Sequence, residues 1–408
     1  MMKTIDFQKE AINMLKELIE MRRSLHEIPE VGFKEFETNK LIQSYLKERI
    51  GIPFKSGLAG GTGIVAILEG AYPGPTIAIR ADMDALPVEE QTGLSFSSKN
   101  KGYMHACGHD GHMAIVLGTA KLLNKYRSQL KGNVKFIFQP AEELGLGAKK
   151  MVDDGVLEDP KVDFIFGFHI WPELDKNKIG IKDGVIMSAG DRFDIEIIGK
   201  GTHGAKPYKG IDSVVISSEV ISAIQTIVSR EIDLLRNTAV ISIGTIEGGT
   251  AFNIIPERVK MTGTIRSTNK EVQKSISQSI ERIVQGITRA HGASYTYKNV
   301  NLFPHTINDK YIARTSYEIL NKALGKEVVE WLQYPGIASE DFSEYLEVTP
   351  GMYFFIGAGE KGKDVDLHNP RYDFDESILT LGVEALCTLV YNLLEKGLVD
   401  KMVVKGLE

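Results

Sequence analysis

The chain has 408 residues, more than one ordinary hydrophobic core accommodates, so two domains are expected. It is 43% hydrophobic and 25% charged, as soluble globular proteins are, and its formal net charge of -6 argues against nucleic acid as a partner. Two cysteines exclude a disulfide framework, and the lack of any uncharged apolar run of about 20 residues argues against a membrane partner.

The first part of the chain alternates predicted helices with predicted strands. Apolar residues recur at helical spacing from Phe7 to Arg23, and a second helix is predicted near 36–46. No apolar segment of the signal-peptide type precedes them, so a cytoplasmic location is expected. The remaining predicted elements are strands at 64–68, 76–80 and 134–138, a helix from 110 to 126, and an apolar run at 164–169. This alternation predicts an α/β sheet covered on both faces.

The pattern changes near Ser188, where alternating strand-like residues begin. The predicted order is strand 193–198, helix 212–230, strands 239–245 and 259–266, helix 271–290 and strand 294–298. This β-α-β-β-α-β order is that of a ferredoxin-like domain. Helices at 309–324 and 376–395 and strands at 328–333 and 352–356 then resume the α/β pattern. We therefore expect an α/β domain formed by 1–188 and 303–408, with 189–302 inserted.

The segment from Met104 to His112 places one thiol and three imidazoles close together. Cysteine and neutral histidine are the side chains that bind zinc and similar transition metals. Cys107 and His109 are two residues apart, so a single turn can direct both at one ion. Taken alone, this pattern also fits a buried cysteine beside histidines that cap the next helix, and that alternative stays open at this point.

Further metal-binding side chains follow other apolar runs. Glu142 and Glu143 come directly after the run at 136–141, His169 closes the run at 164–169, and His368 lies far downstream. Polar residues at the ends of buried strands are where open α/β sheets form their sites. Singly, a glutamate pair is usually a solvated helix start and a histidine a hydrogen-bonded core residue, but their conjunction indicates a metal centre.

Segments along nearly the whole chain, in order, resemble the di-metal aminoacylase/carboxypeptidase family. The resemblance is to its amidohydrolase branch, which includes hippurate hydrolases, N-acyl-amino acid deacylases and plant auxin-conjugate hydrolases. The matching segments are 22–30, 80–87, 105–112, 139–143, 201–207, 253–256, 263–266, 339–342 and 368–370. The resemblance implies a zinc-peptidase-like α/β catalytic domain that carries the ferredoxin-like insertion as a lid domain.

The resemblance also implies roles for individual residues. The implied metal ligands are Cys107, His109, Glu143, His169 and His368. Glu142 is the implied general acid/base, and the lid residues His203, Asn253 and Arg266 would contact substrate. Two divalent ions are expected per chain, with zinc first and manganese or cobalt as alternatives. A homodimer or homotetramer is expected, and whether His203 serves its own or a neighbouring subunit stays open. The chain departs from the wider family where its usual His-x-Asp reads Asp82-Met83-Asp84.

These groups suit amide hydrolysis. Two ions about 3.5–4 Å apart can share one hydroxide nucleophile and polarise the carbonyl. Five ligands are too many for one structural tetrahedral zinc. Because successive side chains point in different directions, Glu143 can bind metal while Glu142 moves the proton from the water to the leaving amine.

Other residues are expected to support the ligands or the substrate. Asp82, Asp84 and Asp110 are candidates for orienting the ligating histidines, although one or more of them could instead cap the helix near 110. The guanidinium of Arg266 suits a substrate carboxylate, Asn253 offers an amide donor, and His203 can donate to the oxyanion. Gly359 belongs to the segment 357–359, which follows a predicted strand and could let substrate approach the backbone closely.

The sequence thus favours a metal-dependent hydrolase of N-acyl amino acids, or of small peptides from the C-terminus. Two alternatives remain. One is a catalytically silent binding protein that kept the fold, and the other is a cysteine-nucleophile or redox enzyme based on Cys107. Metal analysis separates all three.

Overall fold

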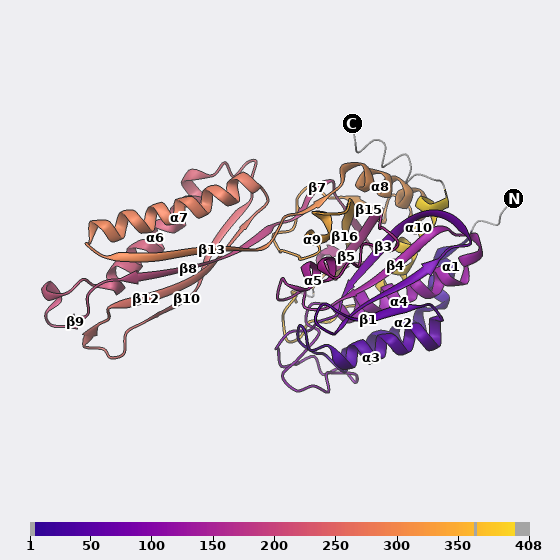
Figure 1. The fold of residues 1–408 in the computed structure, drawn as a ribbon, viewed down its shortest axis with the longest axis horizontal. Helices are drawn as coiled ribbons and strands as arrows, with labels where there is room; N and C mark the ends of the chain where they lie inside the picture. The colour runs from indigo at the N-terminus through magenta and orange to yellow at the C-terminus, as the bar shows by residue number, and fades with distance from the viewer. Residues whose placement is uncertain (1–4, 363–364, 396–408) are drawn as a thin grey trace. The chain divides into compact units, whose positions relative to one another are not determined.

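The computed structural model describes residues 5–362 and 365–395, which form two compact units (Figure 1). Of the described residues, the first unit comprises 5–186, 307–334, 341–362 and 365–395, and the second 187–306 and 335–340. The expected boundaries between the domains were at 188 and 302. Residues 1–4, 363–364 and 396–408 of the expected first domain lie outside the described residues. Segment 335–340 was expected in the first unit. It belongs to the second because Ser188 N–H donates to the carbonyls of Gly336 and Ala338.

The first unit is built on an eight-stranded mixed sheet with the order β1-β2-β4-β3-β5-β16-β6-β15. Its strands are β1 (Phe54–Leu58), β2 (Gly63–Glu69), β3 (Tyr72–Asp82), β4 (Lys131–Gln139), β5 (Phe164–Asp175), β6 (Ile179–Ile181), β15 (Val329–Trp331) and β16 (Gly351–Gly359). The neighbours β4, β3, β5 and β16 are parallel to one another. Their carboxyl ends therefore meet at the same edge of the sheet, where α/β proteins form their sites.

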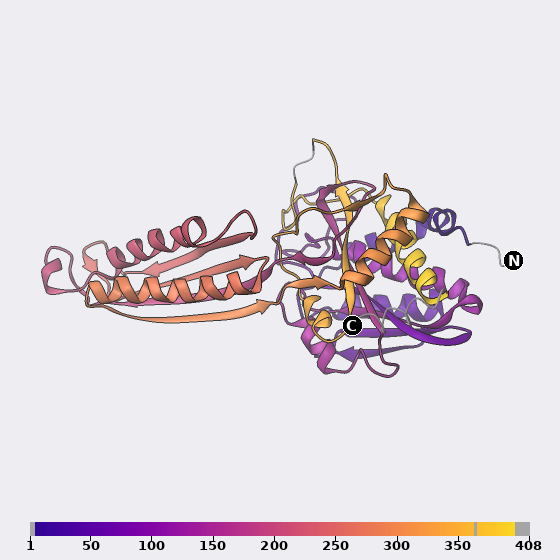
Figure 2. The same ribbon diagram turned by 90° about the horizontal axis from the view of Figure 1, so that it is seen from above.

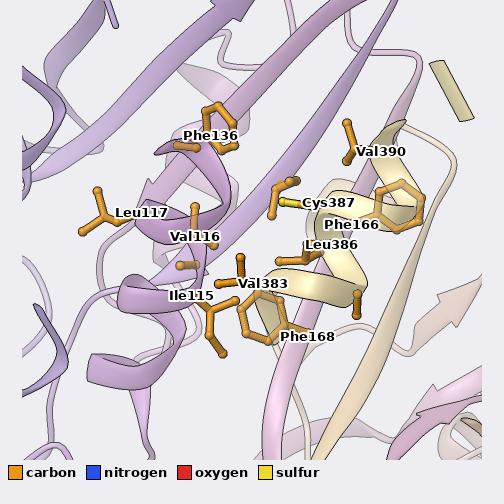
Figure 3. Close-up of a cluster of buried hydrophobic side chains, with 14 of the residues drawn as sticks. Ile115, Val116, Leu117, Phe136, Phe166, Phe168, Val383, Leu386, Cys387 and Val390 are labelled. Atoms are coloured by element: carbon orange, nitrogen blue, oxygen red, sulfur yellow. The ribbon is translucent and has the colours of Figure 1, made fainter. Parts of the chain in front are cut away.

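Helices cover both faces of this sheet. They are α1 (Phe7–Asn13), α2 (Leu15–His26), α3 (Phe36–Ser44), α4 (His109–Lys125), α5 (Gly147–Asp153), α8 (Lys310–Leu324), α9 (Ser343–Leu346) and α10 (Ile378–Glu395). Figure 3 shows side chains of α4 and α10, among them Ile115 and Leu386, packed with Phe166 and Phe168. Gly167, between these phenylalanines, faces the other side of the sheet, against Phe342. The predicted two-sided cover is confirmed.

Several predicted elements have different bounds in the structure, and strands β3 and β13, for example, are longer than predicted. The first helix is broken at Met14 into α1 and α2, and the second ends in a π-helical turn, Tyr45–Ile50. Strand β5 continues past His169 to Asp175 because its pairing with β16 continues, with His169 opposite Phe355. His169 therefore lies within a strand and not at its end.

Helix α10 is the one helix in the described part of the chain that is long and apolar enough to cross a membrane. It is 72% buried, and Cys387 lies at its buried face. Burial against α4 accounts for its apolar sequence, since the core helix of a large domain is apolar on most sides.

The second unit is ferredoxin-like, as predicted. It runs β8 (Ala189–Ile198), α6 (Ser213–Glu231), β10 (Ala239–Gly248), β12 (Arg258–Ser267), α7 (Lys270–Ala290) and β13 (Ser294–Phe303). The sheet has the order β10-β12-β8-β13, and α6 and α7 lie along it (Figure 2). A small ribbon of β9 (Thr202–His203) and β11 (Ile254–Ile255) is added. The chain passes between units at β7 (Gly184–Met187) and β14 (Thr306–Asn308), which pair with each other.

Candidate metal centre

One cysteine and two histidines converge at the carboxyl edge of the first unit's sheet. Cys107 precedes α4, His109 is the first residue of α4, and His169 comes from β5. Gly108 between the first two has a φ of 81°, a turn that favours glycine. Cys107 Sγ lies 3.4 Å from His169 Nε2, and the ligand atoms of all three residues lie within 4.8 Å of one another. The arrangement predicted from Cys107 and His109 therefore exists and includes His169.

Backbone carbonyls fix the tautomers of both histidines. His109 Nδ1 lies 2.9 Å from the carbonyl oxygen of Asp84, and His169 Nδ1 lies 2.7 Å from that of Ile170. A carbonyl oxygen only accepts, so each Nδ1 carries a proton, and in the neutral ring each Nε2 presents a lone pair. His109 Nε2 is buried without a hydrogen-bond partner. A buried lone pair beside a thiol and a second imidazole is suited to a transition-metal ion.

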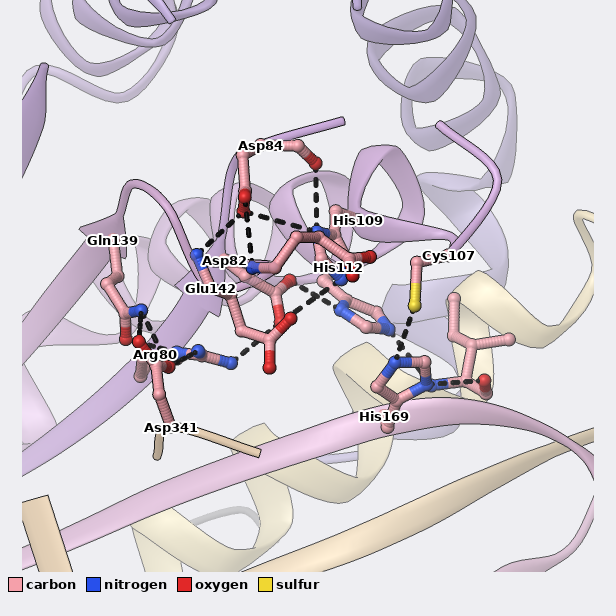
Figure 4. Close-up of polar contacts among 12 residues, drawn as sticks. Arg80, Asp82, Asp84, Cys107, His109, His112, Gln139, Glu142, His169 and Asp341 are labelled. Carbon is pink, nitrogen blue, oxygen red and sulfur yellow. Dashed lines mark hydrogen bonds and ion pairs between the residues drawn. The ribbon is translucent and has the colours of Figure 1, made fainter. Parts of the chain in front are cut away.

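The glutamate pair and His368 complete the cluster (Figure 4 draws its buried part). Glu143 Oε1 lies 3.4 Å from His368 Nε2. Ligand atoms lie within 4.8 Å of one another in two further groups: Cys107, Glu143 and His368, and His109, Glu142 and Glu143. All five predicted ligands and Glu142 are therefore brought together. Because Cys107 and His109 each belong to more than one group, the donor set is wide enough for two neighbouring ions.

The electrostatics of the cluster also fit a cation. Burial, with Glu143 and Glu142 nearby, raises the pKa of the Cys107 thiol. Burial disfavours a charged His109, but the carboxylates of Asp82, Asp84 and Glu143 outweigh it and raise its pKa to about 10. These shifts show a surplus of buried negative charge. A divalent ion would compensate it, favouring thiolate and neutral imidazole, the forms that bind metal.

The turn that presents the glutamate pair is held from two sides. Asp84 accepts the N–H groups of Glu142 and Glu143 at 3.0 and 3.1 Å, which gives this predicted supporting residue a positioning contact. Glu35, which the sequence interpretation did not include, accepts the N–H of Ala141 at 2.9 Å. Ala141 has a φ of 55°, a strained conformation for alanine that persists only where its surroundings fix it.

Asp82 lies beside the cluster, and the predicted ligand nearest to it is His109. Its Oδ1 is 2.6 Å from His112 Nδ1, and its Oδ2 is 2.7 Å from Arg80 Nη1 and 3.6 Å from His109 Nε2. Burial opposes its ionisation, but His109, His112 and Arg80 together hold the pKa of Asp82 well below its usual value. Asp82 is therefore a fixed negative charge beside the histidines.

The prediction for Asp110 was wrong. Its carboxylate accepts from Arg22 Nε at 2.7 Å and lies 2.8 Å from His26 Nδ1, and neither of these residues is a predicted ligand. It is not the helix cap either, because Gly108 holds that position without a side-chain cap. Asp110 instead belongs to a buried charge cluster in which Arg22 also pairs with Asp373. This cluster anchors the start of α4.

Gly359 also has a different explanation. A Cβ at this position would lie 2.5 Å from the carbonyl oxygen of Pro172 and 2.8 Å from that of Leu174. These contacts are closer than Cβ atoms tolerate, so packing against β5 requires glycine here. The backbone that approaches Gly359 closely is that of β5 and not a substrate, so the structure gives no support for the predicted contact between Gly359 and substrate.

The second unit brings His203 and Asn253 together. His203 pairs with Ile254 in the ribbon of β9 and β11, and Gly204 N–H donates to the carbonyl of Asn253 at 2.8 Å. His203 Nδ1 accepts the N–H of Ala205 at 3.0 Å, so Nε2 carries the proton of the neutral ring. Both side chains are exposed. His203 is therefore in the correct tautomer to donate a hydrogen bond from Nε2.

Arg266 lies in β12 of the four-stranded sheet, at the end away from the ribbon of β9 and β11. It pairs with Gly190, whereas the start of β12 pairs with Ile198, eight residues further along β8. Eight residues of strand span about 27 Å. Arg266 Nη1 and the nearby Ser339 Oγ, which sequence reasoning missed, are both buried without a hydrogen-bond partner. Within one copy of this unit, Arg266 and the His203–Asn253 pair are therefore too far apart to hold the same small molecule.

Comparison with known proteins confirms the family resemblance. Residues 78–392 match Peptidase family M20/M25/M40. The chain is 42% identical over 382 residues to N-acetylcysteine deacetylase of Bacillus subtilis, covering 93% of this chain and 97% of that protein. It is 40% identical over 384 residues to thermostable carboxypeptidase 1 of Saccharolobus solfataricus, covering 93% and 96%. A solved Bacillus subtilis structure, described as a dinuclear metal-binding peptidase of the M20 family, matches with a TM-score of 0.80, 39% identity and coverage of 94% and 99%. The chain belongs to peptidase family M20/M25/M40.

Proposed function

We propose that this hydrolase cleaves the amide bond of N-acyl amino acids, or of small peptides from the C-terminus. In the proposal Cys107, His109, Glu143, His169 and His368 hold two divalent ions. The observation that carries it is the convergence of these donors around the unpartnered His109 Nε2, with Glu142 beside them. Zinc is the first choice for a thiol and imidazole set, and manganese or cobalt would also suit its carboxylate side.

When bound, the ions would activate water and polarise the scissile carbonyl. The protein supplies the proton transfer. Glu142 is buried next to His109 and Glu143, and its backbone is fixed by Asp84, so its carboxylate is held at the reacting centre. It would accept a proton from the attacking water and donate it to the departing amine.

Arg266 is proposed to bind the substrate's free carboxylate. Burial lowers the pKa of Arg266, against the carboxylate of Asp191, and its Nη1 lacks a protein acceptor. An unpartnered buried guanidinium N–H is costly unless an anion binds it. A carboxylate would satisfy both Arg266 Nη1 and Ser339 Oγ.

The substrate class is tested with paired substrates. Acetyl-, benzoyl- and indoleacetyl-amino acids and dipeptides are assayed against their C-terminal carboxamides, with wild type and Arg266→Ala. We expect wild type to prefer the carboxylates, and Arg266→Ala to lose about 1.5–3 kcal/mol of transition-state binding per hydrogen bond on these alone. An equal loss on carboxamides would mean that Arg266 supports the fold and does not bind the carboxylate.

We further propose a homo-oligomer, a dimer or tetramer, in which His203 and Asn253 serve the site of a neighbouring copy. The proposal is supported by the distance along β8 that separates His203 and Asn253 from Arg266, because one copy cannot bring all three residues to the same substrate. The same unit exposes apolar side chains at Val214, Val215 and Phe252, the last fully exposed beside Asn253. Its strand β10 is an edge strand, which a second copy could cover.

Mixing inactive variants tests this arrangement. His203→Ala and Glu142→Gln are each expected to be nearly inactive alone, but co-expressed chains should regain activity because a hybrid oligomer contains one intact site. Light scattering gives the oligomeric state. A monomer, or no recovery from confirmed hybrids, would contradict the proposal.

A reactive-cysteine enzyme is less consistent with the site. Reactive cysteines have lowered pKa values and partial exposure, whereas Cys107 is buried and its pKa is raised. We also propose a cytoplasmic location, which fits the presence of two free, buried cysteines.

A further inference from the structure

We propose that His112 is a positioning residue that holds the β5 segment carrying His169, and that Asp82 keeps His112 in the tautomer this requires. The proposal rests on the proposed metal centre, because its consequence is the placement of one ligand. Neither the family comparison nor the ligand set gives His112 a role.

Both ring nitrogens of His112 are engaged. The side chain is fully buried in the first turns of α4. Ile170 N–H donates to His112 Nε2 at 2.9 Å, and His112 Nδ1 lies 2.6 Å from Asp82 Oδ1. An N–H group only donates, so Nε2 is unprotonated and Nδ1 carries the proton donated to Asp82. His112 therefore has no lone pair left for an ion, although its ligand atom lies within 4.8 Å of those of Asp82 and His109.

Ile170 links His112 to the metal centre. Its N–H is held by His112, and its carbonyl oxygen accepts the proton of His169 Nδ1 at 2.7 Å. The pairing of β3 with β5 ends at Ile79 and Phe166. Beyond that point the β5 backbone needs other partners on this edge, and His112 supplies one for Ile170 N–H. Losing this contact would free the backbone that orients His169.

Asp82 is itself immobilised. Its second oxygen accepts from Arg80 Nη1 at 2.7 Å, and Arg80 Nη2 donates to Asp341 at 2.9 Å. Gln139 Nε2 also donates to Asp341, and all four side chains are buried (Figure 4). The chain departs from the His-x-Asp pattern of the wider family at Asp82. Here that carboxylate is committed to Arg80 and His112, which makes it a support for ligands.

Two substitutions separate the contacts of His112. In His112→Asn the amide N–H₂ replaces Nδ1–H toward Asp82, but nothing accepts from Ile170 N–H. In His112→Gln the amide oxygen replaces Nε2 and can accept it. Chelator-stripped wild type and variants are titrated with Co²⁺ against a chromogenic chelator, and the Co²⁺ absorption bands report ligand geometry. We expect His112→Asn to bind the weaker ion roughly 10- to 100-fold less tightly with altered bands, and His112→Gln to recover most of the loss.

His105→Gln is the matched control. His105 is a buried histidine of the same segment, 104–112, and neither of its ring nitrogens has a hydrogen-bond partner. It should leave the Co²⁺ bands unchanged, and urea unfolding of the metal-free proteins checks that each variant folds. If wild type binds no Co²⁺, the metal centre itself is wrong. If wild type binds Co²⁺, the metal centre stands. The positioning role of His112 is then overturned if His112→Asn binds Co²⁺ as tightly as wild type, or if His112→Asn and His112→Gln weaken binding equally.

Discussion

Replacing Glu142 with glutamine is expected to lower kcat by about 10²- to 10⁴-fold, the usual contribution of general acid/base catalysis. Glutamine keeps the shape of the side chain but cannot accept a proton. The backbone contact to Asp84 does not involve the substituted group, so the turn should be retained. Metal content measured by mass spectrometry should match wild type, and kcat and KM are measured on an N-acetyl amino acid.

The neighbouring Glu143→Gln variant is the informative comparison. Glu143 lies 3.4 Å from His368 and within the Cys107 group, so its loss should reduce metal content as well as activity. The pair of variants thus separates proton transfer from metal binding. A fall in kcat of less than tenfold for Glu142→Gln, with metal retained, would show that another group moves the proton.

The fold was predictable because local periodicity carries most of its information. The alternation of apolar residues in β8 and the helical spacing in α7 predicted the ferredoxin-like unit directly. Segment 335–340 could not be assigned this way. Its attachment to the second unit uses backbone hydrogen bonds to Ser188, and backbone groups are the same in every residue.

The ligand set was predictable because segments along nearly the whole chain resemble the family, and because cysteine, histidine and glutamate at 104–112, 142–143, 169 and 368 are side chains that bind transition metals. Their supports were not. Glu35 acts on Ala141 across 106 residues, a contact that no local pattern records. The prediction that Asp110 orients a ligating histidine failed for a geometric reason. Successive helix residues point about 100° apart, so His109 faces the cluster while Asp110 faces Arg22. The separation of Arg266 from His203 depends on strand register, which one sequence does not specify.

Removing the metal is expected to abolish hydrolysis and lower the unfolding temperature, and adding back a divalent ion should restore both. An ion that binds only the folded protein stabilises it by RT ln(1 + [L]/Kd), about 2.7 kcal/mol at 100 times Kd. Without it, Asp84 is buried near the carboxylates of Glu143 and Asp82, and burial together with these charges raises the pKa of Asp84. Dialysis against chelator, metal analysis, activity assays and thermal unfolding measure the effect.

Cys107→Ser is the matched variant, since a hydroxyl keeps the size of the thiol but is a much poorer ligand for zinc. Its Tm should lie close to that of stripped wild type and rise less when zinc is added at the same concentration. The stability readout matters because it does not depend on turnover. Full activity in rigorously metal-free protein would refute the metal-dependent mechanism. If neither chelator nor Cys107→Ser changes the Tm, Cys107, His109 and His169 converge for packing alone. His109 Nε2 is then tolerated without a hydrogen-bond partner and without an ion.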